Sequence, residues 1–321
     1  MDPLSDVLSL LEPRNYMSAG FDAGGSWAIR FPDQQASIKC GTVVTGRCLV
    51  SVEGIPDAVL LRPGDCFLLP HGRTFTLASD ADAEPVAAGA TFASVREGGI
   101  VSHQGGGDCF IVSSRFALLG EHAAGLLRTL PPIVHIPAEA GEANEGALRW
   151  PVERMMQELR QPRPGGTLVM QHLAHMMLIE ALRLHLTEGP AAGRGWLFAL
   201  ADRRLSRALT AIHAEPARRW TLGVLAERAG LSRSSFAERF KTVVGKAPME
   251  YVTQWRMLLA ARRLRDRSEP VSAIALSLGY ESESAFSTAF KREMGISPRH
   301  YGREAEAVDR AATEADALAL V

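Results

Sequence analysis

Hydroxyl, ammonium and aromatic side chains recur at a fixed spacing in the C-terminal third of this 321-residue sequence. Eight residues repeat fifty positions apart in one register: Ser232, Ser234, Phe236, Phe240, Lys241, Gly245, Pro248 and Tyr251, and then Ser282, Ser284, Phe286, Phe290, Lys291, Gly295, Pro298 and Tyr301. Hydroxyl and ammonium groups can donate hydrogen bonds to phosphate oxygens and base edges. The repeat therefore indicates two copies of one supersecondary unit that could contact nucleic acid.

Each copy separates into an apolar and a polar face when it is placed on an α-helix at about 100° per residue. In the first copy Phe236 and Phe240 share one stripe, and Ser234, Glu238 and Lys241 lie on the opposite side. We expect the aromatic stripe to pack inward and the polar face to remain free.

The second copy has the same arrangement, because Phe286 and Phe290 form the apolar stripe. Ser232 and Ser282 lie at the helix starts, where a hydroxyl can cap free amide groups and the helix end favours phosphate. The predicted DNA-contacting residues are Ser232, Arg233, Ser234, Glu238, Lys241, Ser282, Glu283, Ser284, Ser287, Thr288 and Lys291.

Small residues upstream of each copy indicate a helix-turn-helix. Ala226 and Gly230 are four positions apart, and so are Ala275 and Gly279. A small residue lets two helices approach closely, and a glycine allows the backbone to turn between them. The duplicated unit therefore predicts one DNA-binding module with two recognition helices.

Charge is divided unevenly along the chain although the whole carries a formal net charge of −1. Residues 203–301 contain 18 Lys and Arg against 9 Asp and Glu, a net of +9, whereas residues 1–202 carry −7 and residues 302–321 carry −3. Basic residues that neutralise phosphates release counterions, with a salt slope of roughly −0.9 per phosphate. The alternative to a DNA-binding surface is an ordinary solvated one. Taken alone, the arginine run at residues 262–267 would be assigned to such a surface.

Residues 203–301 resemble the DNA-binding domain of the AraC family of bacterial transcription regulators. The residues that carry the resemblance are Leu225, Ala226, Ala229 to Ser232, Phe236, Phe240, Lys241, Gly245, Pro248, Tyr251, Trp255, Arg256, Ala261, Leu264, Ile274, Ala275, Gly279, Tyr280, Ser282, Ser284, Phe286, Ala289 to Lys291, Gly295, Ser297, Pro298 and Tyr301. The resemblance implies two helix-turn-helix subdomains joined by a long helix, here over Met249 to Arg265, which place recognition helices in successive major grooves. It also implies an activator or a repressor.

Two positions on the recognition helices bear on specificity. Thr288 stands where the family often has arginine, and threonine offers one hydroxyl and a methyl suited to thymine instead of a bidentate contact to guanine. Glu238 could accept a hydrogen bond from cytosine, repel phosphate, or pair with Arg239 or Lys241.

The first two thirds of the chain predict a small β-barrel. Short β-branched segments occur at residues 42–45, 49–52 and 59–61 within a strand-rich region from Trp27 to about Val112, and glycines and prolines separate them. Residues 62–72 resemble the second conserved motif of cupin domains, with Gly64, Pro70 and Gly72 at the family's spacing. The predicted fold class is α+β with two domains: a cupin-like β-barrel with a trailing helical pair, and an all-α domain of two helix-turn-helix subdomains.

A metal-dependent cupin enzyme fused to a DNA-binding module is the alternative from a different functional class. The ligands that the resemblance would supply are absent, because no His-x-His precedes Gly46 and Phe75 stands at the histidine position of the second motif. His172 and His175 are three apart on an expected helix without a carboxylate or cysteine companion, and His71 is expected in a turn. We therefore expect no catalytic residue, metal or cofactor.

Four cysteines stand at positions 40, 48, 66 and 109 without the spacing of a zinc site. We expect reduced thiols that pack as small hydrophobic groups. A redox-sensing regulator remains an alternative, because Cys40 and Cys66 could meet across a barrel.

The middle of the chain predicts two helices, at residues 148–160 and 168–186. The second carries an apolar series that would serve as core or as a homodimer interface, namely Leu173, Met176, Met177, Ala181 and Leu184. Its polar interruptions argue against a membrane span, and the N-terminus lacks a secretory signal, so we expect a cytoplasmic protein.

The expected domains are residues 1–190 for sensing and dimerisation, 191–202 as a linker of flexible composition, 203–302 for DNA binding, and a polar tail at 303–321. The expected function is an effector-responsive transcription regulator whose partners are double-stranded promoter DNA, a small-molecule effector or redox signal, and a second copy of the chain. RNA polymerase is a further candidate partner. Trp27, Phe31, Phe67, Phe75 and Phe92 could line the barrel, but packing is the more common role of such residues.

Overall fold

The structure, a computed structural model, describes residues 2–34, 37–92, 99–118, 127, 129–138, 142–188, 195–266 and 269–303. The chain forms two compact units. One, called here the β-unit, comprises Glu12–Gly193, and the other, the helical unit, combines Met1–Leu11 with Arg194–Val321. The first and last parts of the chain therefore belong to the same unit.

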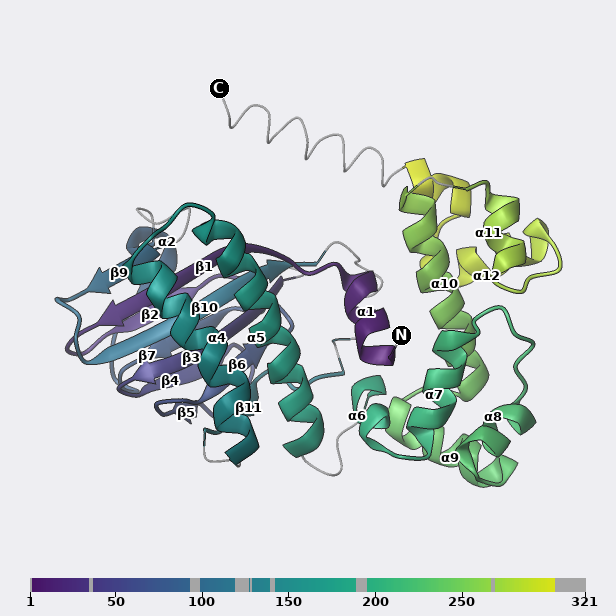
Figure 1. The fold of residues 1–321 in the computed structure, drawn as a ribbon, viewed down its shortest axis with the longest axis horizontal. Coiled ribbons are helices and arrows are strands. Elements are labelled where there is room, and N and C mark those ends of the chain that lie inside the picture. Colours follow the sequence, from purple (N-terminus) through teal and green to yellow (C-terminus); the bar gives the residue numbers. More distant parts are fainter. Residues whose placement is uncertain are drawn as a thin grey trace. The chain divides into compact units, whose positions relative to one another are not determined.

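Two sheets face each other in the β-unit (Figure 1). One sheet has the order β11-β6-β3-β10-β1-β9 and the other β5-β4-β7-β2-β8, with parallel pairing only for β1 with β9 and β2 with β8 among the described strands. The strands are β1 Arg14–Ala23, β2 Ala28–Phe31, β3 Ser37–Thr45, β4 Cys48–Val52, β5 Val59–Leu61, β6 Cys66–Leu69, β7 Phe75–Ala78, β8 Pro85–Ala87, β9 Gly99–His103, β10 Cys109–Ala117 and β11 Val134–Ile136; a short helix, α2 Ala88–Thr91, follows β8.

The core of the β-unit lies between the two sheets. Trp27, Phe31, Phe67 and Phe75 are buried in one hydrophobic cluster, and Phe92 packs against it. Phe31 and Phe75 stack with ring centroids 4.5 Å apart. These aromatic residues therefore contribute core packing, which is the more common of the two roles that the sequence allowed.

Two long helices cover the outer face of the six-stranded sheet (Figure 1). They are α4 Glu142–Arg160 and α5 Gly166–Glu188, so both predicted helices exist and both are longer than predicted. Four members of the apolar series on α5 are buried, whereas Met176 is 39% exposed. Core packing thus accounts for most of that series. Among the described residues no helix is both long enough and apolar enough to cross a membrane.

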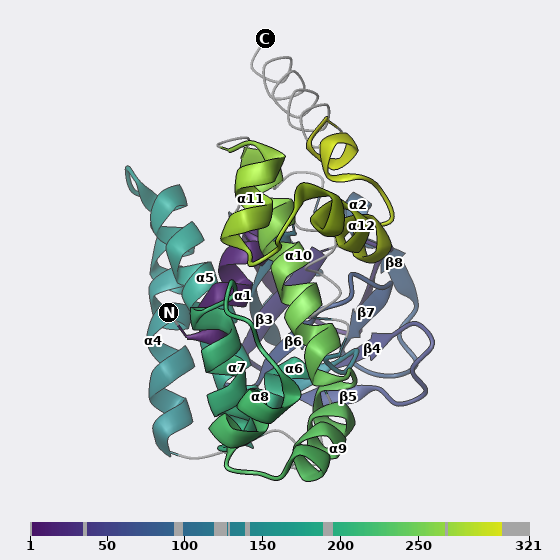
Figure 2. The same ribbon diagram turned by 90° about the vertical axis from the view of Figure 1, so that its right-hand side faces the viewer.

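The helical unit contains α1 Pro3–Leu11, α6 Trp196–Ala201, α7 Leu205–Ala214, α8 Leu222–Ala229, α9 Arg233–Val244, α10 Pro248–Asp266, α11 Val271–Ser277 and α12 Glu283–Met294. The long helix α10 contacts α8 and α9 at one end and α11 and α12 at the other (Figure 2). This arrangement is the predicted pair of helix-turn-helix subdomains joined by a long helix.

Two segments outside residues 203–302 pack within the helical unit. Helix α1 packs on α7 and α10, where Leu4, Val7, Leu10 and Leu11 are buried. Within the expected linker at residues 191–202, helix α6 buries Trp196 and Leu197. Burial of these apolar side chains makes both segments part of the helical unit.

Candidate nucleic-acid interface

The first helix-turn-helix is formed by α8 and α9. The hydroxyl of Thr221 caps α8 by accepting a hydrogen bond from the amide of Val224, 3.3 Å away. Gly230 then ends the helix in the left-handed conformation at φ 65°. A residue with a side chain rarely adopts this backbone angle, so glycine sets the turn that leads into α9.

The recognition helix α9 begins at a serine cap. The hydroxyl of Ser232 accepts a hydrogen bond from the amide of Ser235 at 3.2 Å, as predicted for this position. Phe236 and Phe240 are fully buried, with ring centroids 5.5 Å apart. Their burial fixes the rotation of α9 and leaves the opposite face of the helix accessible.

The second helix-turn-helix repeats these features in α11 and α12. Ser282 caps α12 by accepting a hydrogen bond from the amide of Ala285 at 3.1 Å. Phe286 and Phe290 are fully buried, with ring centroids 5.7 Å apart. The two recognition helices therefore have equivalent anchors and equivalent free faces.

A close backbone approach occurs at the turn before α12. Gly279 has φ 81°, and a Cβ atom built on it would lie 2.2 Å from the carbonyl oxygen of Ala217. Only glycine fits at this position, because any side chain would overlap the backbone of the segment between α7 and α8. The turn thus ties the second subdomain to the first.

A buried histidine of α7, His213, joins α10 to α1. Nε2 of His213 lies 2.9 Å from the hydroxyl of Tyr251, and Nδ1 lies 3.3 Å from a carboxylate oxygen of Asp6. The His213 ring stacks on Trp255 with a centroid distance of 3.7 Å. Burial lowers the pKa of His213 to about 3, so the ring is neutral near pH 7.

Nine of the eleven predicted contact residues are exposed on the two recognition helices or at their caps, and Glu283 and Ser287 are partly exposed. Glu283 accepts a hydrogen bond from Arg299 at 3.2 Å, so its carboxylate is engaged within the protein. The guanidinium of Arg233 lies beside Gly223, where an added Cβ would be 3.0 Å from its Nε atom. The predicted faces are therefore accessible, with Glu283 the least available of the set.

The hydroxyl of Thr288 donates a hydrogen bond to the backbone carbonyl of Ser284 at 3.0 Å. Its donor is used inside the helix, and what remains for a base edge is an acceptor lone pair and the methyl group. Glu238 forms no ion pair with any residue that the structure describes, so its carboxylate is available for a base contact.

Several arginines of the basic surface have structural roles. Arg239 forms an ion pair with Asp202 at 2.6 Å, and Arg256 donates hydrogen bonds to the carbonyls of Pro216 and Arg218. Arg263 pairs with Glu269. Fewer arginines are therefore free to contact phosphate than the net positive charge of this region indicates.

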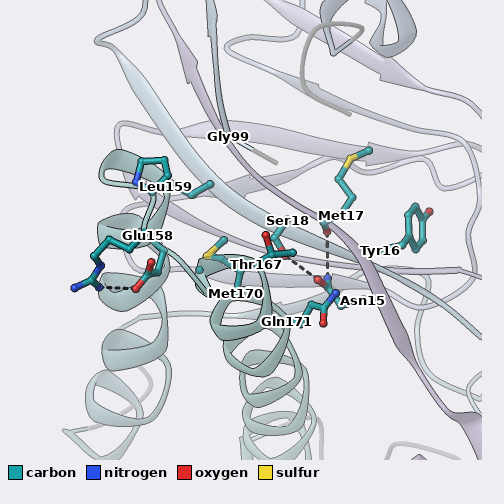
Figure 3. A pocket seen from close by; sticks show the side chains of 13 residues that line it. Asn15, Tyr16, Met17, Ser18, Gly99, Glu158, Leu159, Thr167, Met170 and Gln171 are labelled. Carbon is teal, nitrogen blue, oxygen red and sulfur yellow. Dashed lines mark hydrogen bonds and ion pairs between the residues drawn. The ribbon is translucent and has the colours of Figure 1, made fainter. Parts of the chain in front are cut away.

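In the β-unit a cavity of about 200 Å³ lies between β1 and the connection of α4 to α5 (Figure 3). Ser18 donates a hydrogen bond to the side-chain oxygen of Asn15, whose amide donates to the carbonyl of Met17. The buried carboxylate of Glu158 pairs with Arg154 and Arg163 through one oxygen. Most polar groups of this cavity are thus engaged by the protein itself.

The residues that the sequence singled out in the β-unit have structural partners. Both ring nitrogens of His175 lie near backbone carbonyls, of Gln171 at 2.7 Å and of Pro13 at 2.5 Å. The thiols of Cys40 and Cys66 contact each other on the outer face of the six-stranded sheet, and the hydrogen bond between them, with burial, raises the pKa of Cys40 well above its ordinary value. All four cysteines are reduced and buried.

Comparison with known proteins identifies relatives that match nearly the whole chain. The cupin family model matches residues 2–187, and the helix-turn-helix domain model matches residues 225–304. A putative AraC-like transcription regulator of Streptomyces antibioticus is 46% identical over 301 residues, which cover 94% of this chain and 98% of the relative.

Two further similarities concern a regulator and a solved domain. The HTH-type transcriptional regulator AlkR of Acinetobacter baylyi is 29% identical, over 95% of this chain and 100% of the relative. The solved DNA-binding domain of AdpA, in complex with a target DNA, is 29% identical over 31% of this chain and 90% of that chain, with a TM-score of 0.30. Because the Streptomyces relative matches nearly end to end, the chain belongs to the AraC family of DNA-binding transcription regulators and joins a cupin domain to the helix-turn-helix domain of that family.

Proposed function

We propose that α9 and α12 enter successive major grooves of an operator and that the β-unit controls this binding in response to an effector. The observation that carries the proposal is the duplicated anchor: each helix has a serine cap, two fully buried phenylalanines and an exposed polar face. A helix N-terminus also favours phosphate, which suits both serine caps to the DNA backbone.

Base selectivity is assigned to Ser234, Glu238, Ser284 and Thr288, and backbone contact to Arg233 and Lys241. Lys241 is exposed near the last turn of α9. A flexible ammonium suits a phosphate contact, whereas the hydroxyls and the carboxylate can discriminate base edges.

We further propose that the β-unit has no catalytic role. Its relatives are named as transcription regulators, and the sensor-domain histidine His175 is engaged by backbone carbonyls. Elemental analysis of the purified protein tests this proposal, since stoichiometric iron or manganese would contradict it.

Homodimerisation through α5 is supported by an exposed apolar strip on this helix. Leu168 is 58% exposed, Val169 36% and Met176 39%, and the three lie on one side of α5. Large apolar side chains that remain exposed along one helix face suit a two-fold interface. Sedimentation analysis of the full chain and of a Leu168→Gln, Met176→Gln double variant tests this interface. A dimer that persists unchanged in the variant would exclude the strip as the dimer interface.

Redox sensing through Cys40 and Cys66 is a second candidate, favoured by the contact between the two thiols. Thiolate is the reactive form, and the raised pKa of Cys40 keeps it protonated, so oxidation would be slow. Disulfide mapping after treatment with hydrogen peroxide, alongside operator affinity, tests this candidate.

The experiment that tests the main proposal is selection of bound sequences from a random duplex library with the full-length protein, followed by affinity measurements at several salt concentrations. We expect a site with two conserved blocks about one helical turn apart, because the helices enter successive grooves. Affinity should fall steeply with salt. Absence of any salt-sensitive association with duplex DNA would refute the proposal.

A further inference from the structure

Two cations oppose each other on neighbouring strands of the β-unit. Lys39 of β3 and Arg115 of β10 are directly paired in the antiparallel ladder, so their side chains project from the same face of the sheet. Like charges at directly opposite positions destabilise a sheet. Neither cation forms an ion pair with a residue that the structure describes.

The two cations project from the face that holds the aromatic core. Side chains alternate along β3, and Val43, four positions from Lys39, belongs to the hydrophobic cluster between the sheets. The ammonium nitrogen of Lys39 lies 5.4 Å from the centroid of the Phe31 ring. On the other side the guanidinium of Arg115 lies 5.1 Å from the centroid of the Tyr16 ring.

One polar atom of this pair, on Arg115, lacks the hydrogen-bond partner that burial requires. Nε of Arg115 is buried and has no hydrogen-bond partner among the described atoms. A buried donor without a partner carries the full cost of its desolvation. Burial, together with the charge of Arg115, lowers the pKa of Lys39 to about 8, and burial also lowers the pKa of Arg115.

Two unpaired cations next to each other on the inner face of a sheet raise the free energy of the folded state unless an anion offsets their repulsion. Both residues are partly exposed, so solvent reaches part of each side chain. Beside Lys39, Phe31 is in contact with Phe75 and with Phe92, which is partly buried. Phe92 keeps an accessible side, so an apolar body can pack on its ring while a carboxylate contacts the cations.

We propose that Lys39 and Arg115 bind the carboxylate of a small organic acid whose apolar body packs on the accessible side of Phe92, next to Phe31. This assignment rests on the proposed function, because it makes the acid the effector of the regulator. A carboxylate accepts charge-assisted hydrogen bonds from both groups, which are stronger than those between neutral groups. It also removes the repulsion between the two cations, so binding stabilises the β-unit.

The test uses the full-length protein and 4-phenylbutanoate, with 4-phenylbutanamide as the neutral analogue and acetate as the analogue without an apolar body. Binding is measured by calorimetry and by the shift in Tm. We expect 4-phenylbutanoate to bind with a Kd below roughly 1 mM and the amide to bind at least about tenfold more weakly, because it lacks the charge. Equal affinity for acid and amide would overturn the proposal.

Three variants assign the site. Lys39→Met and Arg115→Met each remove one cation, and we expect each to weaken 4-phenylbutanoate binding roughly 10- to 100-fold, the range of a charge-assisted hydrogen bond. Arg30→Met is the matched control, because Arg30 is exposed on β2 and paired with Glu53. Its affinity should equal that of the wild type.

A second readout separates a binding role from a structural one. Without ligand, Lys39→Met should raise Tm, since it removes a partly buried cation that faces another cation. A lower Tm together with unchanged 4-phenylbutanoate affinity would show that Lys39 is structural and would overturn the site.

The site and the proposed function fail in different ways. Failure to bind any duplex DNA, both with and without 4-phenylbutanoate, refutes operator binding and leaves the carboxylate site intact. Binding of 4-phenylbutanoate that is abolished by Lys39→Met but does not alter operator affinity supports the site and refutes its role as an effector site. No binding of 4-phenylbutanoate up to about 10 mM, well above the expected Kd, overturns the site alone.

Discussion

Replacing Lys241 by alanine should change how the affinity for DNA depends on salt. Lys241 is exposed on α9, opposite the buried Phe236 and Phe240, and forms no ion pair with a described residue. Its charge is therefore available to one phosphate. A single phosphate contact contributes about 0.9 to the slope of log K against log salt.

The size of the effect follows from that slope. Between 50 and 200 mM salt the logarithm of the concentration changes by about 0.6, so one contact changes log K by about 0.5. The ratio of wild-type to Lys241→Ala affinity should therefore shrink roughly 3.5-fold across this range, for all sequences alike. Fluorescence anisotropy with a selected operator and an unrelated duplex measures both slopes.

Arg239 supplies the control on the same helix. It is paired with Asp202 at 2.6 Å and lies on a different side of α9. We expect Arg239→Ala to leave the salt slope within about 0.3 of the wild type, with folding verified by Tm, because no phosphate contact is lost. An unchanged slope for Lys241→Ala, or an equal loss for both variants, would refute the assigned face of α9.

Three further predictions concern specificity and stability. Ser284→Ala should change the base preference in one block of the selected site by about 1 kcal/mol, as measured by repeating the selection; an identical site would remove Ser284 from base readout. Gly279→Ala should lower the free energy of unfolding by about 1–3 kcal/mol in denaturant titration, since its Cβ would lie 2.2 Å from the Ala217 carbonyl oxygen. An unchanged free energy of unfolding would mean that this turn shifts without cost. His213→Phe should cost about 1–3 kcal/mol at pH 7 because it leaves the Tyr251 hydroxyl unpaired. The folded-state pKa of His213 is about 3, below its unfolded value of 6.5, so the wild type should lose stability as pH falls from 6.5 toward 3, by up to about 1.4 kcal/mol per pH unit. The His213→Phe variant should lack this pH-dependent loss. Parallel pH profiles of stability for the two proteins would contradict a neutral, buried histidine.

Local signals made the recognition helices predictable from the sequence. Ser232, Phe236, Phe240 and Gly245 lie within fourteen residues and specify the cap, the buried stripe and the end of one helix. Each of these features depends on helix geometry and on backbone angles, which neighbouring residues determine. The second copy repeats the signal, so the residue pattern alone is enough to assign the buried and the free face of each helix.

Features that depend on distant contacts could not be predicted in this way. Asp6 and His213 are 207 positions apart, and nothing in the local pattern of residues 3–11 indicates which helices will bury Leu4 and Val7. The pairing of Lys39 with Arg115 likewise depends on the register of β3 and β10. A shift of one residue in that register would move one cation to the other face of the sheet.

The connection between the two units follows from their order in the chain. The β-unit, Glu12–Gly193, is inserted between α1 and the rest of the helical unit, so it is joined to that unit covalently at both of its ends. At one end Tyr16 of β1 lies five residues after Leu11, the last residue of α1, and Tyr16 contacts Arg115. An anion bound by Lys39 and Arg115 would therefore act within a few residues of a helix whose apolar side chains are buried in the helical unit.

The free energy available to change DNA binding is limited to the difference in the anion's affinity for the two arrangements of the chain. Residues 3–11 consequently offer a short covalent path from the proposed carboxylate site to α10, and weakening their apolar contacts by Leu4→Ala should reduce the effect of 4-phenylbutanoate on operator affinity without changing its Kd in the absence of DNA.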